Sequence, residues 1–193
     1  SEALTSSIKG YLEKMEVSIK LVGENPNIVN AIKALNEQKG KILGDASHID
    51  NEAIQELQRQ LDLVRESEPA VLHAYLGTSK DKYQKTPIET YASDYRASQR
   101  GWYKGAEENG ELFWTEPYLD FQANKSCITV GYPIKENGTV IGVLGFDLDL
   151  EYIANKYEHI KVGERGFYSL LTPTEVPGQF KSIYNSDKEL AKL

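Results

Sequence analysis

Apolar residues recur every three or four positions along the first third of the chain. In residues 1–23 they form a single stripe, and shorter stripes follow in residues 28–35 and 54–64. This spacing places the apolar side chains on one face of an α-helix, where they contact a core. Gly23 and Pro26 separate the first two stripes. We therefore predict three amphipathic helices at the start of the chain.

From Pro69 onward the hydrophobic period changes to two, which is typical of strands. Residues 70–76 alternate and lead into the turn-rich residues 77–82, so a hairpin is expected there. Further strands are expected at 113–121, 126–134, 139–147 and 166–171. Asn137-Gly138 joins two of these strands and is a strong hairpin signal.

Two helical segments interrupt the series of strands. A polar loop over residues 93–106 runs into a short helix, and residues 148–157 have the spacing of a closing helix. The regular alternation of strand and helix that builds a doubly wound parallel sheet does not occur. The order of elements therefore predicts an α+β fold, with helices first and then a mostly antiparallel sheet.

Composition and charge narrow the class of protein. The chain of 193 residues has 40% hydrophobic and 26% charged residues, which fits a folded protein. Its net charge of −7, without any run of Lys or Arg, argues against nucleic acid as a partner. Cys127 is the single cysteine, so neither a disulfide framework nor a cysteine-based zinc site is expected. The chain starts within a predicted helix and stops abruptly, and we expect it to be part of a longer protein.

Four side chains between Tyr95 and Tyr103 are suited to hold a small ligand. The Arg100 guanidinium is a planar fork that matches a carboxylate. Trp102 adds an indole N–H and a flat apolar wall, and the two tyrosines add rings and hydroxyls. This set predicts a pocket for a small anionic or zwitterionic ligand. The alternative is a structural role, with the tryptophan in the core and the arginine paired to a local acid.

Two further residues favour the zwitterionic ligand. Asp147 ends a strand of Val, Leu and Phe, where an unpaired inward carboxylate would be costly to bury. The ammonium group of a ligand would remove that cost. Asp149 has the same parity and is the alternative inward acid, although capping of the following helix suits it better. Tyr118 places another aromatic hydroxyl on a neighbouring strand.

Four segments resemble the double Cache sensor domain of bacterial transmembrane receptors, both chemoreceptors and sensor histidine kinases. They are RGWYKGA, FWTEPYLD, ITVGYPI and GTVIGVLGFDLDL. The resemblance implies an N-terminal helical region at 1–65, a membrane-distal, ligand-binding PAS-like module at 66–160, and the start of a truncated membrane-proximal module at 161–193. It also implies an extracytoplasmic location, a membrane-anchored parent protein and homodimers formed through the N-terminal helix.

A subset of this family that binds amino acids is more similar still. Its pattern places Tyr95, Arg100, Trp102, Tyr103, Tyr118 and Asp147 around the ligand. The resemblance implies that Arg100 and Trp102 hold the ligand carboxylate with help from Tyr103, while the other three surround the α-ammonium group. The sequence departs from the family's usual DPRxRPWY at Ser98 and Gly101. The motif residues do not specify the pocket for the ligand's side chain, so they do not identify which amino acid binds.

Other functions remain as alternatives. His48, His73 and His159 stand in no metal-ligand or catalytic-triad pattern, so we predict no metal site, no cofactor and no enzymatic activity. Glu116 and Asp120 could be a pair of catalytic carboxylates, as in glycoside hydrolysis, but their spacing on a strand interrupted by a proline gives little support for that role. The ligand could instead be a simple carboxylate, an amine or a purine. The parent protein could be a sensor histidine kinase rather than a chemoreceptor. A third alternative is a dimerisation module whose pocket is vestigial.

Overall fold

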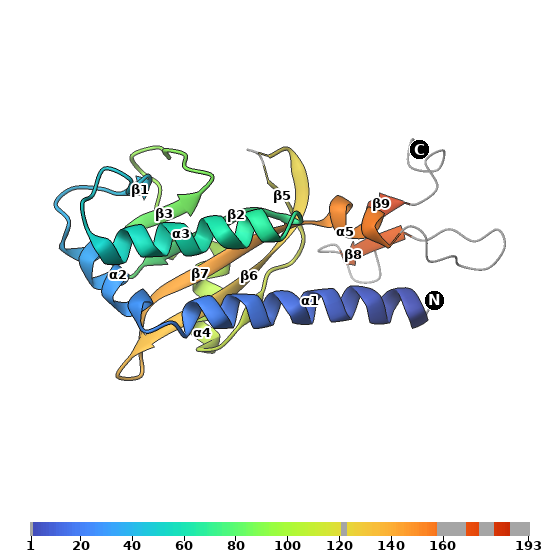
Figure 1. Cartoon of the computed structure of the whole chain (residues 1–193). Helices are drawn as coiled ribbons and strands as arrows, with labels where there is room; N and C mark the ends of the chain where they lie inside the picture. The colour runs from blue at the N-terminus through green and yellow to red at the C-terminus, as the bar shows by residue number, and fades with distance from the viewer. Residues whose placement is uncertain (1, 121–122, 158–168, 174–179, 186–193) are drawn as a thin grey trace.

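The computed structural model describes residues 2–120, 123–157, 169–173 and 180–185. All three predicted N-terminal helices are present (Figure 1): α1 (Glu2–Gly23), α2 (Asn27–Glu37) and α3 (Glu52–Ser67). Their apolar stripes meet in one buried core, as the periodicity predicts. Within the described part of the chain, no helix has both the length and the hydrophobicity needed to cross a membrane.

A seven-stranded sheet forms the centre of the fold. Its strands are β1 (Leu43–Gly44), β2 (Val71–Thr78), β3 (Tyr83–Thr86), β4 (Phe113–Trp114), β5 (Tyr118–Asp120), β6 (Lys125–Glu136) and β7 (Thr139–Asp149). The order is β1-β3-β2-β7-β6-β4, and β5 also pairs with β6. All pairs are antiparallel except β1 with β3. The predicted α+β class with an antiparallel centre is confirmed, and the short parallel β1 makes the sheet mixed.

Alternation along β7 divides its side chains between the two faces of the sheet. Leu144, Phe146 and Leu148 are buried in the core that includes α1, α2 and α3. Val143 has the opposite parity and packs with residues of α4 (Gly101–Asn109). Figure 1 shows α1 and α3 on the near face of the sheet and α4 on the far face. Because Asp147 shares the parity of Val143, its side chain is presented to the α4 face.

The predicted strand at 113–121 is wrong in one respect, because the structure divides it into β4 and β5. Pro117 lies between the two strands and has no backbone N–H to donate to a ladder. The register also changes there: Trp114 pairs with Val130, whereas Tyr118 pairs with Cys127. Four residues along the β4–β5 segment therefore match three along β6, and this irregularity changes the pairing register at the start of β5.

The C-terminal boundaries also differ from the prediction. The strand predicted to end at 147 continues to Asp149, whose side chain accepts a hydrogen bond from the Tyr152 backbone N–H and caps α5 (Leu150–Lys156). Beyond it, β8 (Ser169–Pro173) and β9 (Phe180–Asn185) form an antiparallel pair. The rest of the expected second module at 161–193, including residues 166–168 of the predicted strand, lies outside the described residues.

Candidate functional site

A cleft of 590 Å³ opens on the α4 face of the sheet. Five of the six residues predicted from the sequence line it: Tyr95, Arg100, Trp102, Tyr118 and Asp147. Its wall also contains residues to which the sequence assigned no ligand contact, among them Tyr75, Tyr83, Tyr91, Gln99, Thr115, Leu119 and Asp120. Strands β2, β3, β5 and β7 and the start of α4 therefore contribute to one site.

Asp147 lies in the floor of this cleft, with a polar residue beside it on each neighbouring strand. It pairs in register with His73 on β2 and with Thr129 on β6. Its Oδ1 atom accepts hydrogen bonds from the hydroxyls of Tyr75 (2.5 Å), Thr129 (2.6 Å) and Tyr118 (3.1 Å). Its Oδ2 atom lies 3.2 Å from Nδ1 of His73. The side chain points inward as predicted, and three hydroxyls that the sequence does not reveal stabilise the carboxylate.

The position of the Tyr75 hydroxyl depends on a glycine in the neighbouring strand. Tyr75 pairs with Gly145, and a Cβ atom at Gly145 would lie 2.1 Å from the tyrosine ring. The ring thus occupies the space that a side chain at 145 would fill, and its hydroxyl reaches Asp147 two residues further on. A glycine in the middle of a strand indicates such a close approach, although the sequence does not say of which group.

Asp149, the alternative inward acid, has a different role. It is buried, caps α5 and forms an ion pair with Lys125. Its charge is therefore used at the end of β7, as the capping alternative predicts, and Asp147 is the aspartate of this strand that lines the cleft.

The positive side of the cleft is formed by Arg100. Its side chain is exposed, makes no ion pair with any described residue, and lies 5.8 Å from the centre of the Tyr95 ring. The acid that the structural alternative requires pairs instead with Arg96, whose guanidinium lies 3.3 Å from Asp81. Arg100 also precedes the first residue of α4, where the helix dipole favours an anion. The arginine is thus available to a ligand carboxylate.

Tyrosine rings form the remaining wall. Neighbouring ring centres of Tyr75, Tyr83, Tyr91 and Tyr95 lie 4.4–5.6 Å apart, and Trp102 lies 4.8 Å from Tyr75. Burial raises the pKa of Tyr95 to about 12 and the pKa values of Tyr75 and Tyr83 well above their ordinary range. These hydroxyls therefore stay protonated at neutral pH. Three of the rings were missed because Tyr75 and Tyr83 come from strands, and Tyr91 from a loop, with no local ligand motif.

Tyr103 is the predicted residue that the structure places elsewhere. It is fully buried in the second hydrophobic cluster with Tyr75, Ala97 and Val143, and it does not line the cleft. Its hydroxyl makes no hydrogen bond with any described residue. The Trp-Tyr pair lies in α4, where adjacent residues point in different directions, so only one of the two rings faces the cleft.

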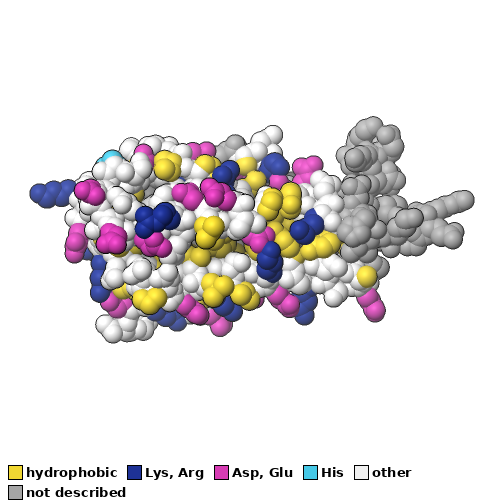
Figure 2. Space-filling model, in the orientation of Figure 1, with side chains coloured by type: hydrophobic (Ala, Val, Ile, Leu, Met, Phe, Trp, Pro, Cys, Tyr) yellow, Lys and Arg dark blue, Asp and Glu magenta, His cyan; other side chains and the backbone are white. Residues whose placement is uncertain are grey.

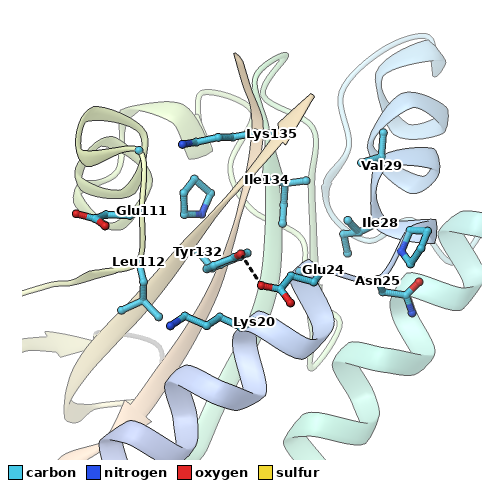
Figure 3. A pocket seen from close by; sticks show the side chains of 14 residues that line it. Lys20, Glu24, Asn25, Ile28, Val29, Glu111, Leu112, Tyr132, Ile134 and Lys135 are labelled. Carbon is cyan, nitrogen blue, oxygen red and sulfur yellow. Dashed lines mark hydrogen bonds between the residues drawn. The ribbon is translucent and has the colours of Figure 1, made fainter. Parts of the chain in front are cut away.

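A second cleft, of 620 Å³, lies between the end of α1, the start of α2 and strand β6 (Figure 3). Lys20 and Lys135 bring two positive charges, and Glu24 and Glu111 bring two negative ones. Tyr132 donates a hydrogen bond to Glu24 over 3.2 Å. Because the charges are balanced and none is deeply buried, this cleft has less to select a charged ligand than the cleft at Asp147.

A family model and the curated relatives that match this chain both belong to methyl-accepting chemotaxis proteins. The family described as "Methyl-accepting chemotaxis protein-like, first PDC sensor domain" matches residues 20–155. Methyl-accepting chemotaxis protein McpC of Bacillus subtilis is 34% identical over 105 residues, which are 54% of this chain and 16% of McpC. The chain spans less than a third of the length of the curated relatives it matches first, between 16% and 30%.

Two solved structures share the fold. The ligand-binding domain of the Pseudomonas aeruginosa amino acid chemoreceptor PctB, in complex with L-Arg, superposes with a TM-score of 0.68 at 22% identity and covers 98% of this chain and 69% of its own. The ligand-binding domain of the Campylobacter jejuni chemoreceptor Tlp3, in complex with 4-methylisoleucine, gives a TM-score of 0.67 at 21% identity, with 98% and 68% covered.

Proposed function

The chain belongs to the family of methyl-accepting chemotaxis protein-like first PDC sensor domains, and from this we propose that it is the extracytoplasmic sensor region of a membrane-anchored chemotaxis receptor that binds a free amino acid. The observation that carries the proposal is the charge arrangement of one cleft. Arg100, without an ion pair among the described residues, and the buried Asp147 both line it. A zwitterion carries the two charges that complement this pair.

Each ligand group has a partner of suitable chemistry. The carboxylate binds the guanidinium of Arg100 and the indole of Trp102. The ammonium group binds Asp147, with the rings and hydroxyls of Tyr95 and Tyr118 around it. A hydrogen bond to a charged group contributes roughly 1.5–3 kcal/mol. Two or three of them, together with burial against the tyrosine wall, are enough for micromolar affinity, which corresponds to about −8 kcal/mol. PctB and Tlp3, with amino acids in their complexes, support this reading.

Calorimetric titration of the chain with the twenty amino acids, acetate, a simple amine and a purine tests the proposal. We expect at least one amino acid to bind at micromolar concentration and the other three probes to give no heat. The best amino acid is then compared with its carboxamide and with its N-acetyl derivative. Each derivative removes one of the two charges, so each should bind at least tenfold more weakly. Binding of acetate or the purine without binding of any amino acid would contradict the proposal.

We also propose that two copies of the chain associate through α1. Figure 2 shows the face formed by α1 and α3, where hydrophobic side chains lie among interspersed acidic and basic ones. Val17 and Leu21, one turn apart on α1, are 57% and 70% exposed. Sedimentation equilibrium at rising concentration should show dimers that Val17→Glu shifts to monomers, while Leu63→Glu on α3, also exposed, leaves them intact. Dimers that survive Val17→Glu would place the interface elsewhere.

A further inference from the structure

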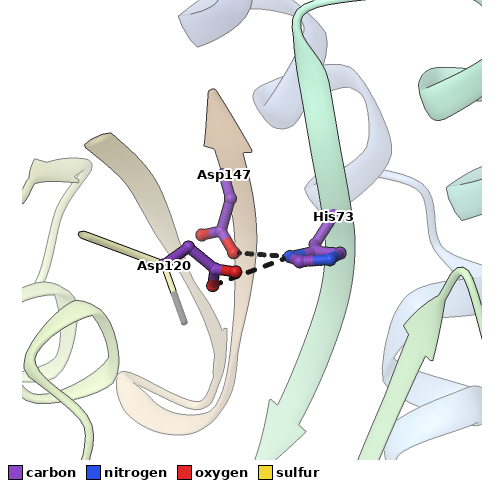
Figure 4. A group of neighbouring side chains, drawn as sticks. All are labelled: His73, Asp120 and Asp147. Atoms are coloured by element: carbon purple, nitrogen blue, oxygen red, sulfur yellow. Dashed lines mark hydrogen bonds and ion pairs between the residues drawn. The ribbon is translucent and has the colours of Figure 1, made fainter. Parts of the chain in front are cut away.

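Three side chains with metal-binding atoms meet in the floor of the ligand cleft, although they are far apart in the sequence. His73 comes from β2, Asp120 from the end of β5 and Asp147 from β7 (Figure 4). Nδ1 of His73 lies 3.2 Å from Oδ2 of Asp147 and 4.0 Å from Oδ2 of Asp120. One ligand atom of each residue lies within 4.8 Å of the other two. His73 and Asp147 are buried, and Asp120 is partly buried.

In each carboxylate the two oxygens have separate surroundings. Oδ1 of Asp147 accepts the three hydroxyl hydrogen bonds, and Oδ1 of Asp120 accepts the Ala123 backbone N–H over 2.6 Å. Oδ2 of both residues faces His73. Structural hydrogen bonds thus hold each carboxylate through one oxygen while the other points at the imidazole. Such outer contacts also orient the ligands of metal sites in proteins.

We propose that His73, Asp120 and Asp147 bind a divalent transition-metal ion of the Zn²⁺ type. An imidazole nitrogen and two carboxylate oxygens suit Zn²⁺ and its neighbours, whereas Ca²⁺ takes six to eight oxygens. Metal–ligand bonds of about 2.0–2.2 Å in a tetrahedron place ligand atoms about 3.4 Å apart. The His73–Asp147 pair already has nearly this separation. Because the three ligand atoms lie within 4.8 Å of one another, Asp120 must move inward by up to about 1.4 Å.

Electrostatics favours a cation at this place. Two carboxylates within a partly buried cluster repel each other, and a bound divalent ion neutralises both. The fourth coordination position then faces the cleft, since Asp120 and Asp147 line it. One consequence rests on the proposed function: the metal ion and the ammonium group of an amino acid both need Asp147, so they exclude each other. By linkage, each lowers the apparent affinity of the other.

Titration calorimetry of the chelator-treated chain with Zn²⁺, in the absence of amino acids, tests the site. Amino acids are omitted because they bind Zn²⁺ in solution. We expect one strong site, which His73→Gln and Asp120→Asn each weaken at least tenfold. His48→Gln, at an exposed histidine away from the cleft, is the matched control and should bind as the original chain does. Zn²⁺ should also raise the melting temperature of the original chain and of the control.

Two outcomes overturn the metal site. One is the lack of any strong Zn²⁺ site in the original chain, and the other is unchanged binding in both His73→Gln and Asp120→Asn. If the buried His73 variant does not fold, Asp120→Asn decides, because an asparagine keeps the oxygen that accepts the Ala123 N–H. Amino-acid binding is measured separately in the presence of chelator. Failure of the metal site is therefore distinguishable from failure of the proposed function.

Discussion

At the scale of single residues, the chemistry of the cleft depends on what surrounds Asp147. Hydroxyls of Tyr75, Tyr118 and Thr129 converge on one of its oxygens, and the ring of His73 lies beside the other. These contacts fix the direction of the carboxylate before a ligand binds, which lowers the entropy lost on binding. The sequence predicts an inward acid here from strand parity alone. It does not predict the hydroxyls, because they come from strands 18 to 72 positions away.

Arg100 provides the sharpest test of the carboxylate site. Arg100→Ala should weaken amino-acid binding about 100-fold, because it removes roughly 3 kcal/mol of charge-assisted hydrogen bonds. Arg100→Lys keeps the charge but loses the planar fork, and should recover part of the affinity. The side chain is exposed and has no ion pair among the described residues, so the free energy of unfolding should change by less than about 0.5 kcal/mol in both. Calorimetry and urea denaturation measure the two quantities. An Arg100→Ala protein that binds normally contradicts the assignment.

Tyr103→Phe separates the two aromatic residues of α4. Because the Tyr103 hydroxyl is buried and finds no hydrogen-bond partner among the described residues, its removal should leave the free energy of unfolding unchanged or raise it by about 1 kcal/mol. The affinity for the amino acid should stay within twofold, since the ring does not line the cleft. A tenfold loss of affinity on calorimetry would instead restore the ligand contact that the family resemblance implies for this residue.

At the scale of the elements, the hydrophobic period predicts where helices and long strands lie, but it does not predict how the strands pair. The helices and the long strands β6 and β7 were predicted because a period of 3.6 or 2 persists over many residues. The two-residue strand β1 is too short to show a period, and β4 was predicted only as part of one longer strand over residues 113–121. Strand parity places Asp147 on one face, but the register that sets it opposite His73 and Thr129 depends on contacts across the sheet. The sequence therefore predicted Asp147 as a site residue but did not predict which residues surround it.

Two identical substitutions in different elements should have opposite effects. Gly145→Ala places a methyl group 2.1 Å from the buried Tyr75 ring, so overpacking should lower the free energy of unfolding by roughly 1–3 kcal/mol. The displaced Tyr75 hydroxyl should also reduce amino-acid affinity. Gly10→Ala lies on α1 with nothing within 4 Å of the new methyl group and should raise stability by up to about 1 kcal/mol. Urea denaturation of both variants checks the signs, and a stable, fully binding Gly145→Ala protein would show that the ring yields freely.

At the scale of the whole molecule, the sheet separates the ligand cleft from α1, the helix through which we propose that two copies associate. The cleft lies on the α4 face, and α1 packs on the opposite face through the core that contains Phe146 and Leu148. These two residues flank Asp147 in β7. A shift of Asp147 toward a ligand therefore moves backbone whose alternate side chains pack in the same core as α1. Strand β7 therefore directly connects the cleft on one face of the sheet with the α1 core on the other face.

The tyrosine wall should also limit the stability of the whole domain at alkaline pH. In the unfolded chain tyrosines ionise near pH 10, whereas burial raises the pKa of Tyr95 to about 12 and those of Tyr75 and Tyr83 further. Above about pH 10 the unfolded chain has released protons that the folded chain retains. The contribution of these tyrosines to the free energy of unfolding should therefore be constant below about pH 9, fall as the pH rises from about 10, and keep falling to at least about 12, by up to about 1.4 kcal/mol per pH unit for each such tyrosine.

Urea denaturation at a series of pH values from about 8 to about 11, with tyrosinate absorbance followed in parallel, measures this dependence. Tyr83→Phe removes one ring hydroxyl from the buried wall and should make the decline shallower, whatever it does to the stability at neutral pH. The hydrogen bond to Asp149 raises the pKa of Lys125, so this lysine adds to the same decline, and the difference between Tyr83→Phe and the original chain isolates the tyrosine contribution. If the tyrosines titrate near pH 10 while the chain stays folded, the wall is open to water, and the water exclusion that strengthens the contacts of the buried Asp147 is absent.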